Sequence, residues 1–195
     1  MARTASVTRQ TKETNITCVL KLDGTGKATV STGLPFLDHM MDALVRHSRI
    51  DLELKAQGDV EVDDHHTVED TALTLGQALD QALENRAGIA RFGSAYAPLD
   101  EALARSVVDL SGRPYPSIDL GLKREMIGQV ACENLTHFFQ SLAFAGRMSL
   151  HVDVLKGDND HHRVEAAFKA TALALRQAIA ATGEASVPST KGALG

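Results

Sequence analysis

Alternating apolar and polar residues mark the expected strands of this chain. Residues 14–22, 50–56 and 148–154 carry apolar side chains at every second position, and this period of two predicts half-buried strands. Further strands are expected over 102–110 and 115–120. The turn composition of Asp23-Gly24-Thr25-Gly26 predicts that residues 27–32 return as a hairpin partner of the first strand.

Helical periodicity fills the segments between these strands. Apolar side chains recur at helical spacing over residues 35–48, 64–86, 129–145 and 158–182. Pro35 suits the first turn of a helix, while Gly88 and Gly183 suit helix ends. Helices packed on one face of mostly antiparallel sheets predict an α+β fold.

The second half of the chain repeats the pattern of the first. The strands that begin at Ile50 and Met148 are 98 positions apart, and so are His39 and His137 in the preceding helices. We therefore predict an internal duplication, in which each half-domain is a small sheet with two helices on one face. The expected half-repeats are residues 9–88 and 89–183, followed by a polar tail at 184–195.

Composition excludes several classes of protein. With 44% hydrophobic and 23% charged residues, the chain is expected to fold rather than to be disordered. A net charge of -5 argues against a nucleic-acid partner, which requires a basic face. No stretch has the ~18 apolar residues of a membrane helix, and the first residues lack the apolar core of a signal peptide. Two cysteines, Cys18 and Cys132, favour a reducing, cytoplasmic location.

Six of the eight histidines fall into two matched sets. The first block is Asp64-His65-His66-Thr67-Val68-Glu69, and the second, 96 positions later, is Asp160-His161-His162-Arg163-Val164-Glu165. On a helix, residues three and four apart share one side, so both histidines of a block can lie beside its glutamate. The leading aspartate is expected to cap the helix or to support an imidazole.

Imidazole and carboxylate together suit a divalent transition metal such as Mn, Fe, Co or Zn. An exposed polar helix face is the plain alternative for a single block of this kind. Retention of the block in both halves, with a matching His39 and His137, favours metal ligation instead. Six histidines and two glutamates would serve two ions, with open positions typical of catalytic sites.

At these residues the chain resembles a known family. The motifs that carry the resemblance are Gly33-Leu-Pro-Phe-Leu-Asp-His-Met40, Asp64-His-His-Thr-Val-Glu-Asp70, Ser111-Gly-Arg-Pro114, Asp160-His-His-Arg-Val-Glu-Ala166 and Pro188-Ser-Thr-Lys-Gly192. Together they are similar to imidazoleglycerol-phosphate dehydratase, an enzyme of histidine biosynthesis. The resemblance extends over residues 9–192.

This resemblance implies a hydro-lyase that converts D-erythro-imidazoleglycerol phosphate to imidazole acetol phosphate and water. It also implies a single domain over residues 1–195 with a ribosomal S5 domain 2-like fold and two Mn²⁺ per active site. The family assembles from trimers into 24 subunits, with active sites between subunits. The chemistry needs Lewis acids because the C–H bond is barely acidic and hydroxide is a poor leaving group.

The resemblance carries over site residues position by position. The implied metal ligands are His39, His65, His66, Glu69, His137, His161, His162 and Glu165. Glu13 matches the proposed catalytic carboxylate, a role that suits a general acid or base. The implied phosphate contacts are Arg91, Arg113, Lys169, Ser189 and Lys191. Ala43 stands where several relatives have glutamine, so no substrate contact is carried over to it.

Two other functions are compatible with the same residues. A dimetal hydrolase acting on a small phosphorylated substrate would release phosphate or cleave an ester, whereas the dehydratase retains phosphate on a ketone product. A metal-storage or metal-sensing oligomer would need no basic residues near its ions. The basic set of Arg91, Arg113, Lys169 and Lys191 speaks against storage.

Overall fold

The computed structural model describes residues 2–192 and 194, and both halves of the chain have the same order of main elements, to which the second half adds a short two-stranded sheet before its first helix. The first half comprises β1 (Thr4–Gln10), β2 (Thr14–Lys21), β3 (Ala28–Ser31), α1 (Pro35–Ser48), β4 (Asp51–Gly58) and α2 (His65–Leu83). The second half comprises β5 (Phe92–Leu99), β6 (Ala102–Asp109), β7 (Tyr115–Asp119), β8 (Met126–Ile127), β9 (Val130–Ala131), α3 (Cys132–Ala145), β10 (Ser149–Lys156) and α4 (Asp160–Ala178). The predicted α+β fold with two repeated half-domains is confirmed.

Each half contributes one four-stranded sheet, ordered β1-β2-β4-β3 and β5-β6-β10-β7. Most neighbours are antiparallel, as predicted, but β3–β4 and β7–β10 are parallel. The predicted hairpin between residues 14–22 and 27–32 is therefore wrong. The chain crosses through α1 after β3, and β4 then inserts between β2 and β3.

Two strands, β1 and β5, were not predicted from the alternation. In β5 the pattern is reversed, because the bulky Phe92 and Tyr96 point outward while Gly93 and Ala97 are buried. The reason is the close approach of α4: a Cβ atom on Gly93 would lie 1.9 Å from the carbonyl oxygen of Ala174. Only glycine allows the helix to pack this closely on the strand.

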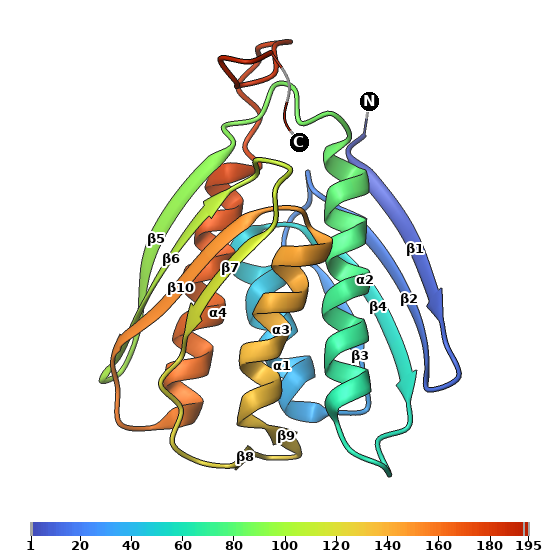
Figure 1. Cartoon of the computed structure of the whole chain (residues 1–195), viewed down its shortest axis with the longest axis vertical. Helices are drawn as coiled ribbons and strands as arrows, with labels where there is room; N and C mark the ends of the chain where they lie inside the picture. The colour runs from blue at the N-terminus through green and yellow to red at the C-terminus, as the bar shows by residue number, and fades with distance from the viewer. Residues whose placement is uncertain (1, 193, 195) are drawn as a thin grey trace.

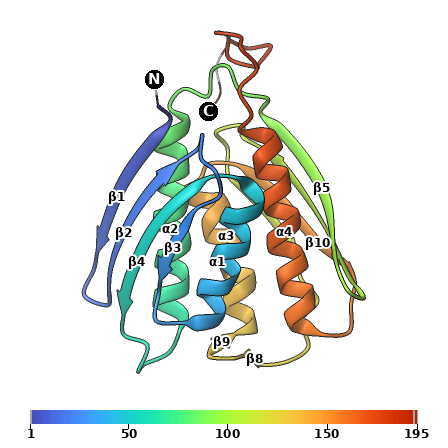
Figure 2. The same cartoon turned by 180° about the vertical axis from the view of Figure 1, so that it is seen from behind.

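The four helices form the interior layer between the two sheets (Figures 1 and 2). They pack as pairs that join the halves, since α1 lies against α4 and α3 lies against α2. All four helices begin at the same end of the molecule, which is the lower end in Figure 1. This arrangement brings the first turns of helices from different halves side by side.

The core between the helices is fully buried. The rings of Phe138 and Phe139 on α3 lie 5.1 and 4.6 Å from that of Phe168 on α4. Met40 and Met41 are the corresponding buried residues of α1. Within the described residues, no helix combines the length and apolar character needed to cross a bilayer.

Candidate metal centre

Three of the predicted ligands, on α1 and α4, lie close together. They are His39, His161 and Glu165, here termed the α1–α4 cluster. Nε2 of His39 and Nε2 of His161 lie 3.2 and 3.3 Å from the same oxygen, Oε2, of Glu165. The other oxygen, Oε1, accepts a hydrogen bond from Lys169 Nζ at 2.7 Å. Burial opposes ionisation of Glu165, but Lys169, assisted by His39, outweighs it and keeps the pKa of this carboxyl below its ordinary value.

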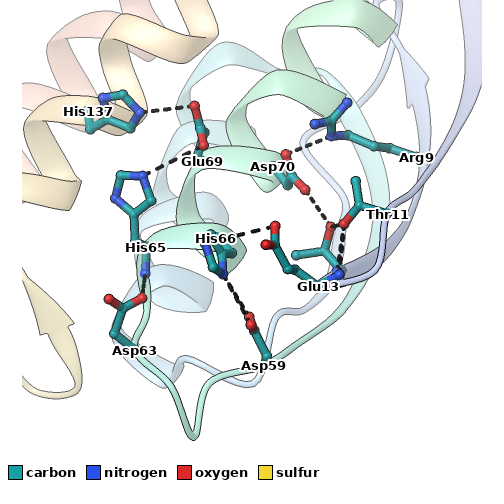
Figure 3. A network of polar contacts seen from close by, with 11 residues as sticks. Arg9, Thr11, Glu13, Asp59, Asp63, His65, His66, Glu69, Asp70 and His137 are labelled. Atoms are coloured by element: carbon teal, nitrogen blue, oxygen red, sulfur yellow. Dashed lines mark hydrogen bonds and ion pairs between the residues drawn. The ribbon is translucent and has the colours of Figure 1, made fainter.

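The second group, here termed the α2–α3 cluster, consists of His65, Glu69 and His137 (Figure 3). Nε2 of His137 lies 3.2 Å from Glu69 Oε1, and Nε2 of His65 lies 3.7 Å from Glu69 Oε2. Each cluster therefore combines a histidine and glutamate of one half with a histidine of the other half. Neither half holds a complete set by itself.

Both clusters suit a divalent transition-metal ion. Within each, two imidazole nitrogens and one carboxylate oxygen lie within 4.8 Å of one another, close enough to turn toward a common ion. Two nitrogens and one oxygen are a donor set typical of Mn, Fe, Co or Zn sites. Three donors from one chain leave further coordination positions for another ligand or a substrate.

His66 and His162 do not join these clusters. Nδ1 of His66 lies 3.1 Å from Asp59 Oδ2, and Nδ1 of His162 lies 2.8 Å from Glu101 Oε2. These hydrogen bonds raise the pKa of both histidines, and the bond with His162 lowers the pKa of Glu101 to about 2. The expectation that His66 shares a side with Glu69 is not met, because the Asp59 carboxylate turns this imidazole away from the cluster.

The two leading aspartates have a different role from the one expected. Asp64 makes no capping bond to α2; its carboxylate accepts from the N–H of Ala131 at 2.9 Å. Asp160 accepts from the N–H groups of Lys123 and Arg124, at 3.0 and 2.7 Å. Both aspartates thus tie a helix start to the segment 120–131, and α4 is capped instead by Asn159.

Sequence reasoning missed the residues that support the imidazoles. Asn134 Oδ1 lies 2.8 Å from His65 Nδ1, and Gln140 Oε1 lies 3.3 Å from His137 Nδ1. Both residues are three positions from His137, so the helical spacing of amides around this histidine was an available signal.

Glu13 lies at the turn between β1 and β2, near the first turn of α2 (Figure 3). Its side chain is 53% exposed, and Oε2 is 3.9 Å from His66 Nε2. The turn is held against α2 by the buried Asp70, which accepts hydrogen bonds from Arg9 and Thr14. A carboxylate in this position is open to a bound molecule yet fixed relative to the helix that carries Glu69.

The predicted phosphate contacts lie at two opposite ends of the folded molecule. Lys169 lies beside the α1–α4 cluster, 2.7 Å from Glu165. The N–H of Arg91, by contrast, bonds to the carbonyl oxygen of Ala178, 13 residues after Glu165 on α4. At 1.5 Å per residue, the two ends are about 20 Å apart. The side chain of Arg91 pairs with Asp109 and with the carbonyl oxygen of Pro188, which places the tail with Ser189 and Lys191 at that far end. Arg113 follows β6, whose end lies beside Arg91, since the N–H of Leu110 donates to the carbonyl oxygen of Arg91 at 3.1 Å.

Comparisons with known proteins agree on one family. Residues 32–175 match the family model described as imidazoleglycerol-phosphate dehydratase. Curated proteins of that name from Schizosaccharomyces pombe and Methanothermobacter thermautotrophicus are 49% and 51% identical over 98% of this chain, covering 100% and 98% of those relatives. The one from Phytophthora nicotianae is 59% identical over 98% of this chain, which spans 42% of that longer relative.

Solved structures of the same name share the fold. The dehydratase of Staphylococcus aureus superimposes with a TM-score of 0.83 at 36% identity, over 92% of this chain and 99% of that one. The Pyrococcus furiosus structure, in complex with (S)-C348, gives a TM-score of 0.81 at 37% identity, over 96% of this chain and 100% of that one.

Proposed function

This chain belongs to the imidazoleglycerol-phosphate dehydratase family of hydro-lyases in histidine biosynthesis, and on that premise we propose that it is a manganese-dependent enzyme. It removes water from D-erythro-imidazoleglycerol phosphate and yields imidazole acetol phosphate. The observation that carries the proposal is the pair of two-histidine, one-glutamate clusters, each assembled from both halves of the chain. Two clusters match the proposed two Mn²⁺ per active site.

Each cluster would hold one ion through His39, His161 and Glu165 or through His65, Glu69 and His137. When bound, Mn²⁺ supplies Lewis acidity toward the imidazole ring of the substrate. We assign Glu13 to proton transfer, since its half-exposed carboxylate lies beside α2, 3.9 Å from His66 Nε2, where a bound molecule can reach it. A carbon-bound proton and a hydroxyl group leave together as water, and the resulting enol becomes the ketone.

The most direct test is product formation by the purified, manganese-loaded protein. We expect imidazoleglycerol phosphate to be converted to the acetol product with its phosphate retained. Release of inorganic phosphate would instead support a dimetal hydrolase. If the loaded protein makes neither product, the enzymatic proposal fails.

We further propose that the active site is completed between subunits of a 24-subunit assembly built from trimers. Two observations support this arrangement. His66 and His162 turn away from the clusters of their own chain, so they are available as the remaining ligands for ions held by a neighbour. The polar tail lies about 20 Å from the clusters of its own chain along α4, which is too far to contact one small substrate there. The tail at 184–195 would then bind substrate held by a neighbouring subunit.

Chelation of the metal is therefore expected to weaken the assembly. Ions shared between subunits link them, so treatment with EDTA should shift the protein to smaller species, and added Mn²⁺ should restore the large one. Light scattering coupled to size-exclusion chromatography measures both steps. An unchanged mass after complete metal removal would contradict ligand sharing.

We also place the enzyme in the cytoplasm. Cys18 and Cys132 are both free and buried, as is common for thiols of proteins that remain in a reducing compartment.

A further inference from the structure

The internal duplication allows the two metal clusters to be compared position by position. His39 and His137 correspond at a spacing of 98 residues, and Glu69 and Glu165 correspond at a spacing of 96. The three donors of one cluster therefore have exact chemical counterparts in the other. Differences between the clusters must come from the residues around the donors.

The imidazoles of the α2–α3 cluster are oriented by hydrogen bonds. Asn134 binds Nδ1 of His65 and Gln140 binds Nδ1 of His137, which leaves both Nε2 atoms aimed at Glu69. Amide oxygens at these positions accept from the Nδ1–H tautomer, and this tautomer presents a free lone pair on Nε2. The α2–α3 cluster is thus organised before an ion arrives.

The α1–α4 cluster lacks this support. The counterpart of Asn134 is Phe36, whose ring meets that of His161 edge to face at 5.1 Å. The counterpart of Gln140 is the exposed Asp42. Within the described residues, Nδ1 of His39 and Nδ1 of His161 have no hydrogen-bond partner. Both Nε2 atoms face Glu165, but no protein acceptor fixes the tautomer that would leave them free for an ion.

A second difference lies on the carboxylates. Lys169 follows Glu165 by four residues and binds its Oε1 at 2.7 Å, so one carboxylate oxygen and part of the negative charge are already engaged. The corresponding position after Glu69 is Leu73, which carries no charge. Both oxygens of Glu69 face the histidines, at 3.2 and 3.7 Å. A cation beside Glu165 repels an incoming metal ion, and Glu69 has no such neighbour on α2.

We infer that the two clusters are unequal metal sites, and that the α2–α3 cluster binds a divalent transition-metal ion at least about tenfold more tightly than the α1–α4 cluster. Metal binding in the α2–α3 cluster is favoured by Asn134, Gln140 and Leu73. Metal binding in the α1–α4 cluster is weakened by Phe36 and Lys169 at the matched positions. The inference rests on the proposed metal dependence and extends it to an order of filling. At limiting metal, the enzyme would hold ions in its α2–α3 clusters alone.

The experiment is a Mn²⁺ titration of the metal-stripped full-length protein, with free Mn²⁺ measured by electron paramagnetic resonance. We expect two classes of site, one of each per chain, separated by at least about tenfold in affinity. Glu69→Gln should remove the tight class and leave the weak one. Glu165→Gln should remove the weak class and leave the tight one.

Reciprocal substitutions at the matched positions test the cause. Lys169→Met should raise the affinity of the weak class about tenfold, and Leu73→Lys should lower that of the tight class by a similar factor. Leu73 is only partly buried, so a lysine there can be accommodated, and its position four residues after Glu69 allows its ammonium group to reach that carboxylate. Asn134→Ala should also weaken the tight class and leave the weak class unchanged.

A single class of two identical sites would overturn the inference, and so would loss of the tight class in Glu165→Gln. If the parent protein still forms the acetol product, that result leaves the proposed function standing. A protein that binds no Mn²⁺ at all would overturn the inference and the proposed metal dependence together.

Discussion

Glu13→Gln is expected to lower turnover by about 10²–10⁴-fold, the usual contribution of a positioned acid or base. The substitution keeps the size of the side chain but replaces the carboxylate by an amide, which cannot act as the acid or base. Because Glu13 is 53% exposed and no closer than 3.9 Å to His66, folding should not depend on its charge. Steady-state kinetics on the manganese-loaded protein measure the loss.

The matched control for this variant is Glu53→Gln, which makes the same change at an exposed position on the outer face of β4. It should turn over at the parental rate. The Glu13 variant should also keep parental manganese content and assembly size, which separates a chemical role from a structural one. Near-parental turnover in Glu13→Gln would remove this residue from the mechanism.

Phe168→Ala is expected to destabilise the folded chain by about 3–5 kcal/mol, as for other buried aromatic residues. Its ring is fully buried and lies 4.6 and 5.1 Å from those of Phe139 and Phe138. Removing it leaves a cavity between α3 and α4, where the two helices belong to the same interior layer. A loss of this size is a large part of the ~5–15 kcal/mol that holds most domains together.

Denaturant unfolding of the metal-free protein at one fixed concentration measures this effect, because bound ions and assembly would otherwise add to the apparent stability. Phe144→Ala on α3 is the matched control, since this ring is 54% exposed. Its unfolding midpoint should stay close to that of the parent. Equal midpoints for the two variants would show that the aromatic core does not carry the stability assigned to it.

The fold was predictable where one face of a strand carries large apolar side chains. The predicted strand over residues 50–56 overlaps β4, and that over 148–154 overlaps β10, because both are central strands packed on helices. β1 and β5 were not predicted because they are edge strands with small inward residues such as Ala5 and Gly93. The parallel pairing of β3 was not predicted either. A glycine-containing turn favours a hairpin between neighbouring strands, but β4, which follows later in the chain, lies between β2 and β3.

The composition of the metal clusters was only partly predictable. Helical spacing placed His65 beside Glu69 and His161 beside Glu165, and the structure shows both pairs. Spacing alone could not show which histidine turns away, because the partners that hold His66 and His162 are Asp59 and Glu101, on loops outside the helices. Nor could it pair His137 with the first block, which depends on α3 crossing to the other half.

That crossing bears on the ancestry of the protein. A half-length chain with one such block and one earlier histidine would have no metal site as a monomer, since its own histidine and glutamate pair only with a histidine of the other half. Two copies related by a two-fold axis would form both sites at once, with identical surroundings. The present chain therefore corresponds to a fused homodimer. The differences at matched positions of the two halves, Lys169 for Leu73 and Asn134 for Phe36, then arose after the two copies became one polypeptide.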